Sequence, residues 1–198
     1  MAEGVFVKLG WLFSAILISG CATTPDNRRI WIDDETYKNS IAPYTRTAQA
    51  YEGFQNVLDV RMTLMNAKVR NAQTLQKATS FQWSEKEAQA DRQYSQDSML
   101  TETRFFLSFF TPESKNDNLA KADTVWRIFL DVDGKRYNGT ITRALETPTE
   151  ILDVYPEHTR WQSAYYVKFM APTRLVEEGP SKITITGPVG SAELQFQP

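Results

Sequence analysis

The residue best suited to acid–base chemistry is His158, the only histidine among the 198 residues of the chain. A histidine that acts as a general base needs a nucleophile beside it and an acidic group that orients its ring. Serines and aspartates are frequent, but no serine lies in a nucleophile motif such as Gly-x-Ser-x-Gly. Because His158 lies between Pro156 and Trp161 in an irregular stretch, we expect a polar surface or edge residue.

Carboxylate side chains are numerous, but their spacing favours structural roles. Asp131, Asp133 and Gly134 are spaced like the start of a calcium-binding loop. Position 12 of such a loop needs a bidentate glutamate and is Thr142 here, so we interpret Asp133-Gly134 as a hairpin turn. The acidic run at residues 33–35 is typical of a solvated linker, although it could bind a divalent cation weakly. We therefore predict no metal site.

Catalysis by two carboxylates stays open, because 24 aspartates and glutamates are available. Sequence spacing cannot show whether two of them lie about 5–9 Å apart, as glycoside hydrolysis requires. The phosphate-binding loop, the dinucleotide fingerprint and the His-Glu-x-x-His motif are all missing. No residue is therefore assigned a catalytic role.

The only cysteine, Cys21, follows an apolar N-terminal segment. The stretch from Leu9 to Ile18 has the length of a signal-peptide core and is shorter than a membrane-spanning helix of ~20 residues. The small residues Ser19 and Gly20 let the chain enter a narrow peptidase cleft in extended form. The segment resembles the bacterial lipoprotein signal, whose lipobox reads aliphatic, small, small, cysteine, here Ile18, Ser19, Gly20 and Cys21.

This resemblance covers residues 1–21 and implies a diacylglyceryl thioether on Cys21, cleavage before it and an acylated new N-terminus. Several acyl chains anchor stably, whereas one chain is marginal at ~0.8 kcal/mol per buried methylene. The family also implies export to the outer membrane, because residue 22 is Ala and not Asp. An uncleaved membrane anchor is the alternative. With Cys21 acylated no thiol is free, which excludes cysteine nucleophiles and cysteine–zinc sites, and no cofactor is expected beyond the covalent lipid.

The size of the chain suits one domain, which the resemblance to the lipoprotein signal places in the cell envelope. A formal net charge of −2 argues against a nucleic-acid surface, which needs clustered basic charge. We predict a signal peptide over residues 1–20, a lipidated cysteine and tether over 21–43, and a single domain over 44–198. Ile30, Trp31 and Ile32 interrupt the polar tether, so this trio either docks on the domain or contacts an envelope partner.

The pattern of the domain is mainly β with one helical insertion. Residues 58–65 alternate with period two, which predicts a strand over 44–65 with a bend or bulge at Gly53. Residues 66–80 and a second segment starting at the capping box of Ser84 and Glu87 predict a helical insertion at about 66–97. Further strands are predicted over 101–110, 124–132, 136–145, 161–170, 182–186 and 192–196, with 146–156 irregular.

About seven strands joined by turns predict an antiparallel β-sandwich within an α+β fold, immunoglobulin-like in the broad sense. A small barrel is the alternative. The strand over 101–110 is apolar on both faces from Phe105 to Phe110, so either the helical insertion covers one face or an aromatic patch is exposed.

The sequence thus favours a lipid-anchored envelope protein that acts as a non-enzymatic binding or scaffolding module. Its expected partners are the membrane and an envelope protein. An envelope hydrolase with a carboxylate-based or His158-based site, and a carrier of an apolar ligand, remain as alternatives.

Overall fold

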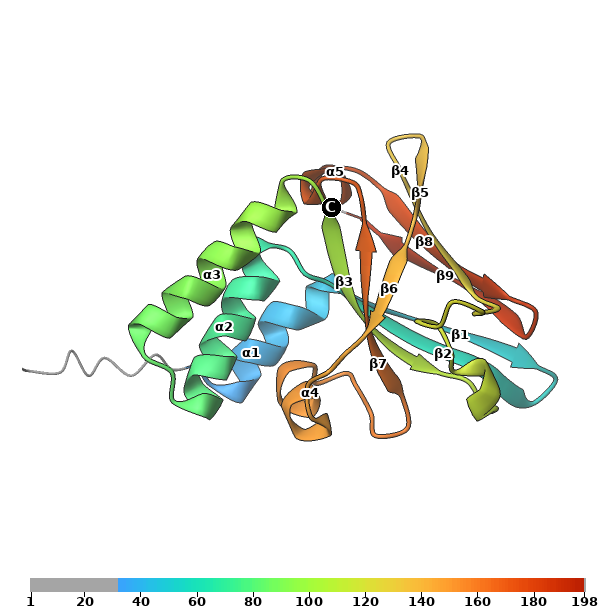
Figure 1. Ribbon diagram of the computed structural model, residues 1–198, viewed down its shortest axis with the longest axis horizontal. Helices are drawn as coiled ribbons and strands as arrows, with labels where there is room; N and C mark the ends of the chain where they lie inside the picture. Colours follow the sequence, from blue (N-terminus) through green and yellow to red (C-terminus); the bar gives the residue numbers. More distant parts are fainter. Residues whose placement is uncertain (1–31, 198) are drawn as a thin grey trace, which may run out of the picture.

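The computed structural model describes residues 32–197, which form two antiparallel sheets and five α-helices (Figure 1). The first sheet contains, in spatial order, β1 (Thr45–Glu52), β2 (Gln55–Leu64), β3 (Thr103–Phe110), β7 (Ser163–Phe169) and β6 (Thr140–Arg143). The second sheet contains β5 (Lys135–Asn138), β4 (Arg127–Val132), β8 (Ser181–Gly187) and β9 (Gly190–Phe196). The helices are α1 (Asp34–Ile41), α2 (Ala67–Phe81), α3 (Glu85–Met99), α4 (Pro148–Val154) and α5 (Thr173–Glu178), and two short 3-10 turns span Ala42–Tyr44 and Ser114–Asn116. The predicted α+β class is confirmed, but the prediction of about seven strands is wrong, because the described residues form nine.

Side chains that alternate along the strands of both sheets enter one shared apolar core. Its buried members include Leu58, Val60, Met62, Phe105, Leu107, Phe109, Tyr165, Val167 and Phe169 from the first sheet, and Ile128, Leu130, Ile183, Ile185, Leu194 and Phe196 from the second. Every second side chain of a strand lies on the same face. The apolar residues that alternate along the sequence are therefore the residues that form this core.

The two sheets approach each other at both edges. Gly139 lies between β5 and β6, where the chain passes from one sheet to the other. A Cβ at this position would lie 3.1 Å from side-chain carbons of Phe169 and Val167, so any other residue at the crossing would have to displace these side chains by a few tenths of an ångström. At the opposite edge, the Nε of Arg46 on β1 donates to the Gln195 carbonyl on β9 at 3.1 Å. The single strand predicted over 136–145 is therefore wrong, since its halves belong to different sheets.

Two tight reversals carry glycine at positive φ. The single strand predicted over 44–65 is a hairpin of two strands, β1 and β2. Gly53 has a φ of 59° and lies in the turn between them, where a bend or bulge was predicted. The predicted Asp133-Gly134 turn is confirmed, with φ of 50° and 67°, between β4 and β5. Such turns need positive φ, which glycine adopts without steric cost.

Residues 34–41 were predicted as part of the tether and instead form α1, so the predicted boundary at residue 43 is wrong. Tyr37 and Ile41, four residues apart on one helix face, are buried against Val69 and Ala72 of α2. The Asp33 carboxylate caps α1 by accepting from the Thr36 backbone N–H at 2.9 Å, with Asp34 and Glu35 in the first turn. The acidic run is a helix N-terminus, where negative charge is favourable.

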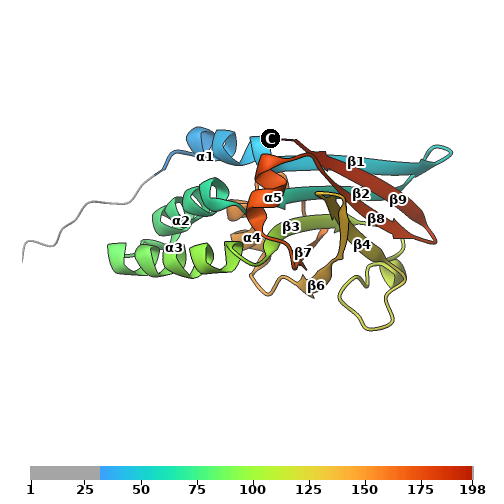
Figure 2. The ribbon, with the colours of Figure 1, turned by 90° about the horizontal axis from the view of Figure 1, so that it is seen from above.

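The predicted helical insertion is confirmed as α2 and α3, with the break between them at Gln82 and the capping box of Ser84 and Glu87 in place. Figures 1 and 2 show α1, α2 and α3 side by side at one end of the sheets.

The cover over the outer face of β3 comes from a helix that was not predicted. Residues 146–156 were expected to be irregular, but α4 begins there with a capping box between Thr147 and Glu150 and with Pro148 in its first turn. Ile151 and Val154 of α4 pack with Phe106 of β3 in a second, smaller core. The following Tyr155 ring stacks on Phe106, with 3.4 Å between ring centroids. Both faces of β3 are therefore covered as expected, although α4 and not the insertion covers Phe106.

Candidate functional site

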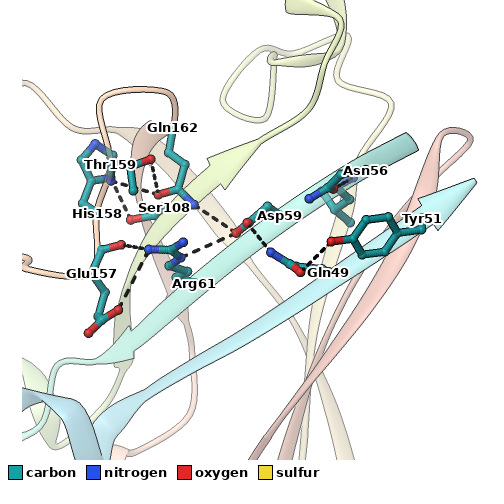
Figure 3. A network of polar contacts seen from close by, with 11 residues as sticks. Gln49, Tyr51, Asn56, Asp59, Arg61, Ser108, Glu157, His158, Thr159 and Gln162 are labelled. Atoms are coloured by element: carbon teal, nitrogen blue, oxygen red, sulfur yellow. Dashed lines mark hydrogen bonds and ion pairs between the residues drawn. The ribbon is translucent and has the colours of Figure 1, made fainter. Parts of the chain in front are cut away.

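His158 lies in the loop between α4 and β7, directly above the outer face of the first sheet. Its Nδ1 is 2.8 Å from the Oγ of Ser108 on β3 (Figure 3). Both side chains are buried, with 8% of His158 and 2% of Ser108 exposed. The prediction of a surface or edge histidine is therefore wrong, because the loop folds back onto β3.

A histidine beside a serine is the arrangement that a hydrolase would use, but the surroundings of this pair favour a structural role. A catalytic imidazole is stabilised in its charged form by a carboxylate. The hydrogen bonds of residues 32–197 give His158 no carboxylate partner, and burial together with the nearby charge of Arg61 lowers its pKa. Ser108 is also enclosed within the sheet, so a substrate could not reach its hydroxyl.

A polar network fastens the same loop to β1 and β2, as Figure 3 shows. Arg61 donates to the backbone carbonyl of Glu157, and its Nε lies 3.7 Å from the Asp59 carboxylate. That carboxylate also accepts from Gln49 at 2.7 Å and from Gln162 at 3.1 Å. These contacts hold the loop rigidly, so the surface it forms with α4 is preorganised.

One surface of this loop encloses a cavity of about 240 Å³, with His158, Arg143, Arg160 and Leu152 among its lining residues. Three large apolar side chains flank this cavity and are exposed to solvent. Leu152 lines it, while Leu145 and Trp161 each lie between two lining residues in the chain. Leu145 is 95% and Trp161 is 75% exposed, and large apolar side chains left exposed beside a cavity can contact a bound molecule.

Two more cavities continue from this one along the outer face of the sheet. The second, of about 220 Å³, lies between the α2–α3 turn and α4, and aromatic residues Phe81, Trp83, Tyr155 and Tyr166 line it. The third, of about 400 Å³, lies between α2 and the β6–β7 edge. Glu146 lines all three cavities, and we call the combined depression the Glu146 groove.

Hydrogen bonds and burial set the charges within the Glu146 groove. The Tyr166 hydroxyl donates to the Glu146 carboxylate at 2.5 Å. Burial raises the pKa of Tyr155 to about 12 and also raises the pKa of Tyr166, so both phenols stay protonated at neutral pH. The Glu150 carboxylate accepts from the Thr147 backbone and side chain, which lowers its pKa. The groove therefore presents neutral phenol donors beside the carboxylates of Glu146 and Glu150.

Most of the residues singled out as sites in the sequence lie outside the part of the chain that the structure describes. The lipobox residues Ile18, Ser19, Gly20 and Cys21 lie outside the described residues, as do Ile30 and Trp31. The half-buried Ile32 packs beside Tyr37 and donates its backbone N–H to the Thr79 hydroxyl at 3.2 Å. Contact of this trio with a partner stays a prediction.

The acidic residues examined for metal binding have structural partners. Asp131 forms a bidentate pair with Arg136, at 2.7 and 2.8 Å, and Asp133 lies in the hairpin turn. Within residues 32–197, no three or more His, Cys, Asp or Glu side chains are grouped so that they could hold a metal ion. No helix in this same part of the chain is long and apolar enough to cross a membrane.

Sequence reasoning missed the Glu146 groove, although a weak signal was present. One face of β3 and β7 carries both cations and aromatic residues at a two-residue period. Its members are Arg104 and Phe106 on β3, and Tyr166 and Lys168 on β7. Neither a protein-family model, nor a curated protein, nor a solved structure matches this chain.

Proposed function

We propose that this protein is a non-enzymatic binding module, held in the cell envelope by a lipid on Cys21, and that the Glu146 groove is its binding surface. The observation that carries this proposal is the meeting of three cavities at Glu146, flanked by exposed Leu145, Leu152 and Trp161. Monomeric surfaces expose large clustered apolar side chains mainly where another molecule binds.

The groove supports binding better than hydrolysis. Glu146 and Glu150 are the only carboxylates that line its three cavities. A hydrolytic general acid needs a raised pKa, whereas the pKa of Glu150 is lowered by its hydrogen bonds to Thr147. The His158–Ser108 pair offers no accessible nucleophile either. A carboxylate-based or His158-based hydrolase is therefore the weaker candidate.

The fold provides a rigid support for such a surface. We take the two sheets as a β-sandwich that is nearly closed into a barrel, because residues of both sheets fill one core and β5 continues into β6 across Gly139. A sandwich of this kind fixes the outer face of the first sheet, on which the groove lies. The anchor, by its resemblance to the lipoprotein signal, would hold this face near the outer membrane.

Site-specific photocrosslinking in intact envelopes tests this function. A photoreactive residue is placed at Leu145 or at Trp161, and at the exposed Lys135 of the β4–β5 hairpin as a matched control. We expect a discrete crosslinked species from the first two positions and none from position 135. A monodisperse protein that gives no discrete product, or the same products from all three positions, would contradict the proposal.

A further inference from the structure

The third cavity of the Glu146 groove is lined by four cationic side chains in a protein whose formal net charge is −2. They are Arg70 and Lys77 of α2, Arg104 of β3 and Lys168 of β7. We call this space, of about 400 Å³, the basic cavity. Three elements far apart in the sequence converge to form it, so its charge is a property of the fold.

The carboxylates around the basic cavity do not balance these cations. Arg104 and Lys168 share one carboxylate, that of Glu102, with the Lys168 Nζ at 3.4 Å. Both side-chain contacts of Arg70 go to a neutral acceptor, because its Nε and Nη2 donate to the Ser95 hydroxyl at 3.0 and 2.8 Å. The ion pairs of the described residues include none with Lys77, whose Nζ lies 5.9 Å from the centre of the Trp83 ring. The Glu150 carboxylate also interacts electrostatically with Lys77, so with Glu102, Glu146 and Glu150 counted one formal positive charge remains in excess.

An aromatic cavity adjoins the basic one. Lys77, Glu146 and Tyr166 line both, so the two spaces lie next to each other at these side chains. Beyond them the second cavity is walled by Trp83 and Tyr155 and by apolar atoms of α4. A molecule bound across both would therefore meet positive charge at one end and aromatic surface at the other.

We propose that the basic cavity binds a phosphate monoester whose apolar organic group lies in the aromatic cavity. At neutral pH such a phosphate carries a charge between about −1.5 and −2, which is opposite in sign to the excess charge of the cavity. Lysine and arginine are the side chains that bind phosphate oxygens best, and their charged hydrogen bonds are stronger than neutral ones. This proposal rests on the proposed function in one respect, that the groove is a binding surface.

Calorimetric titration of the full chain in a non-ionic detergent tests the ligand class. Phenyl phosphate carries both halves of the proposed ligand, inorganic phosphate carries the charge alone, and benzyl alcohol carries the ring alone. We expect phenyl phosphate to bind at least about tenfold more tightly than either. Lys77→Gln and Lys168→Gln should each weaken it about tenfold, because each removes a charge-assisted contact.

Lys182→Gln is the matched control, because Lys182 lies on β8 in the other sheet, where its Nζ pairs with Glu193 at 2.8 Å. This variant should bind phenyl phosphate as the unchanged protein does. Thermal unfolding of each variant establishes that the fold persists, and binding is compared only among folded variants. Lys77→Gln and Lys168→Gln alter different elements of the structure. If one of these variants fails to fold, the other still tests the proposal.

Dihexanoyl phosphatidic acid, a soluble short-chain lipid, distinguishes the two sources of such a ligand. Tighter binding than phenyl phosphate would identify a lipid headgroup, and weaker binding would identify a soluble phosphate ester; both support the proposal. Equal affinity for phenyl phosphate and inorganic phosphate, no measurable binding of either, or an equal loss in Lys182→Gln would overturn it. The crosslinking at Leu145 and Trp161 is independent of this titration, so the binding function can survive the loss of this ligand class.

Discussion

At the scale of single residues, His158 is held as a neutral ring by its surroundings. Its Nδ1 is paired with Ser108 at 2.8 Å, its side chain is buried, and the charged group that influences it is the cation of Arg61. Burial and a neighbouring cation both disfavour the imidazolium, so protonation opposes the folded state.

The lowered pKa of His158 makes the stability of the protein depend on pH. Burial and Arg61 lower the folded-state pKa of His158 below its ordinary value of 6.5, so between the two pKa values the unfolded chain binds more protons. The contribution of His158 is therefore complete above about pH 6.5 and is lost as the pH falls from there through the folded-state pKa. Urea unfolding from pH 8 to pH 5 should show this loss as a decrease in the free energy of unfolding.

The matched control is His158→Asn, which keeps a polar group toward Ser108 but does not titrate. Carboxylates titrate alike in both proteins, so the difference between the two unfolding free energies isolates the histidine. That difference should change only as the pH falls below about 6.5. Parallel curves over the whole range would show that His158 is not kept neutral by the fold.

At the scale of elements, α4 positions the groove although it has only seven residues. So short a helix is not stable by itself, and it depends on its cap and on burial of Ile151 and Val154 against Phe106. We predict that Thr147→Ala lowers the free energy of unfolding by about 1 kcal/mol, because the Glu150 backbone N–H loses the Thr147 hydroxyl as its acceptor. Chemical denaturation measures this change.

Thr149→Ala is the corresponding control, since Thr149 is exposed in the same first turn of α4. Its effect should stay within about 0.5 kcal/mol, as for most surface substitutions. Equal losses in the two variants would mean that the cap contributes nothing specific.

Elements with a local signal could be predicted from the sequence, and those that depend on distant contacts could not. The alternation along β2 and β7 and the capping box at Ser84 are carried by neighbouring residues, and the structure contains each of them. The cap at Thr147 was also present in the sequence, but seven residues are too few for a helical period to become visible. The side chains that approach Gly139 closely, Val167 and Phe169, lie on β7 and are distant in sequence, so the role of Gly139 cannot be predicted from its neighbours in the chain.

The candidate site was the least predictable part for the same reason. Arg70, Arg104 and Lys168 come from α2, β3 and β7, and only the order of the strands brings them to one cavity. Arg104 and Lys168 each stand between buried strand residues, so the local pattern marks only the polar face of each strand and gives no more than a weak signal. The burial of His158 likewise depends on a loop that folds back onto β3.

At the scale of the whole molecule, α2 connects the N-terminal segment with the groove. Ile32 donates to Thr79 on α2, and Tyr37 of α1 donates its hydroxyl to the Val154 carbonyl of α4. Lys77 of the same α2 helix lines two of the three cavities. From Cys21 to Ile32 the chain can span at most ~40 Å, at ~3.5 Å per residue. A lipid on Cys21 would thus keep Ile32, and the end of α2 that it contacts, within about that distance of the bilayer.

The attachment itself gives the last prediction. Cys21→Ser should abolish labelling of the protein by radioactive palmitate, because a serine hydroxyl cannot form the thioether. Without acyl chains at this position, the protein should also be extracted from membranes without detergent. Ser19→Ala is the matched control, because it keeps a small residue in the lipobox, and it should retain full labelling. Continued labelling of Cys21→Ser would refute the anchor, and equal loss in both variants would point to failed export in place of failed acylation.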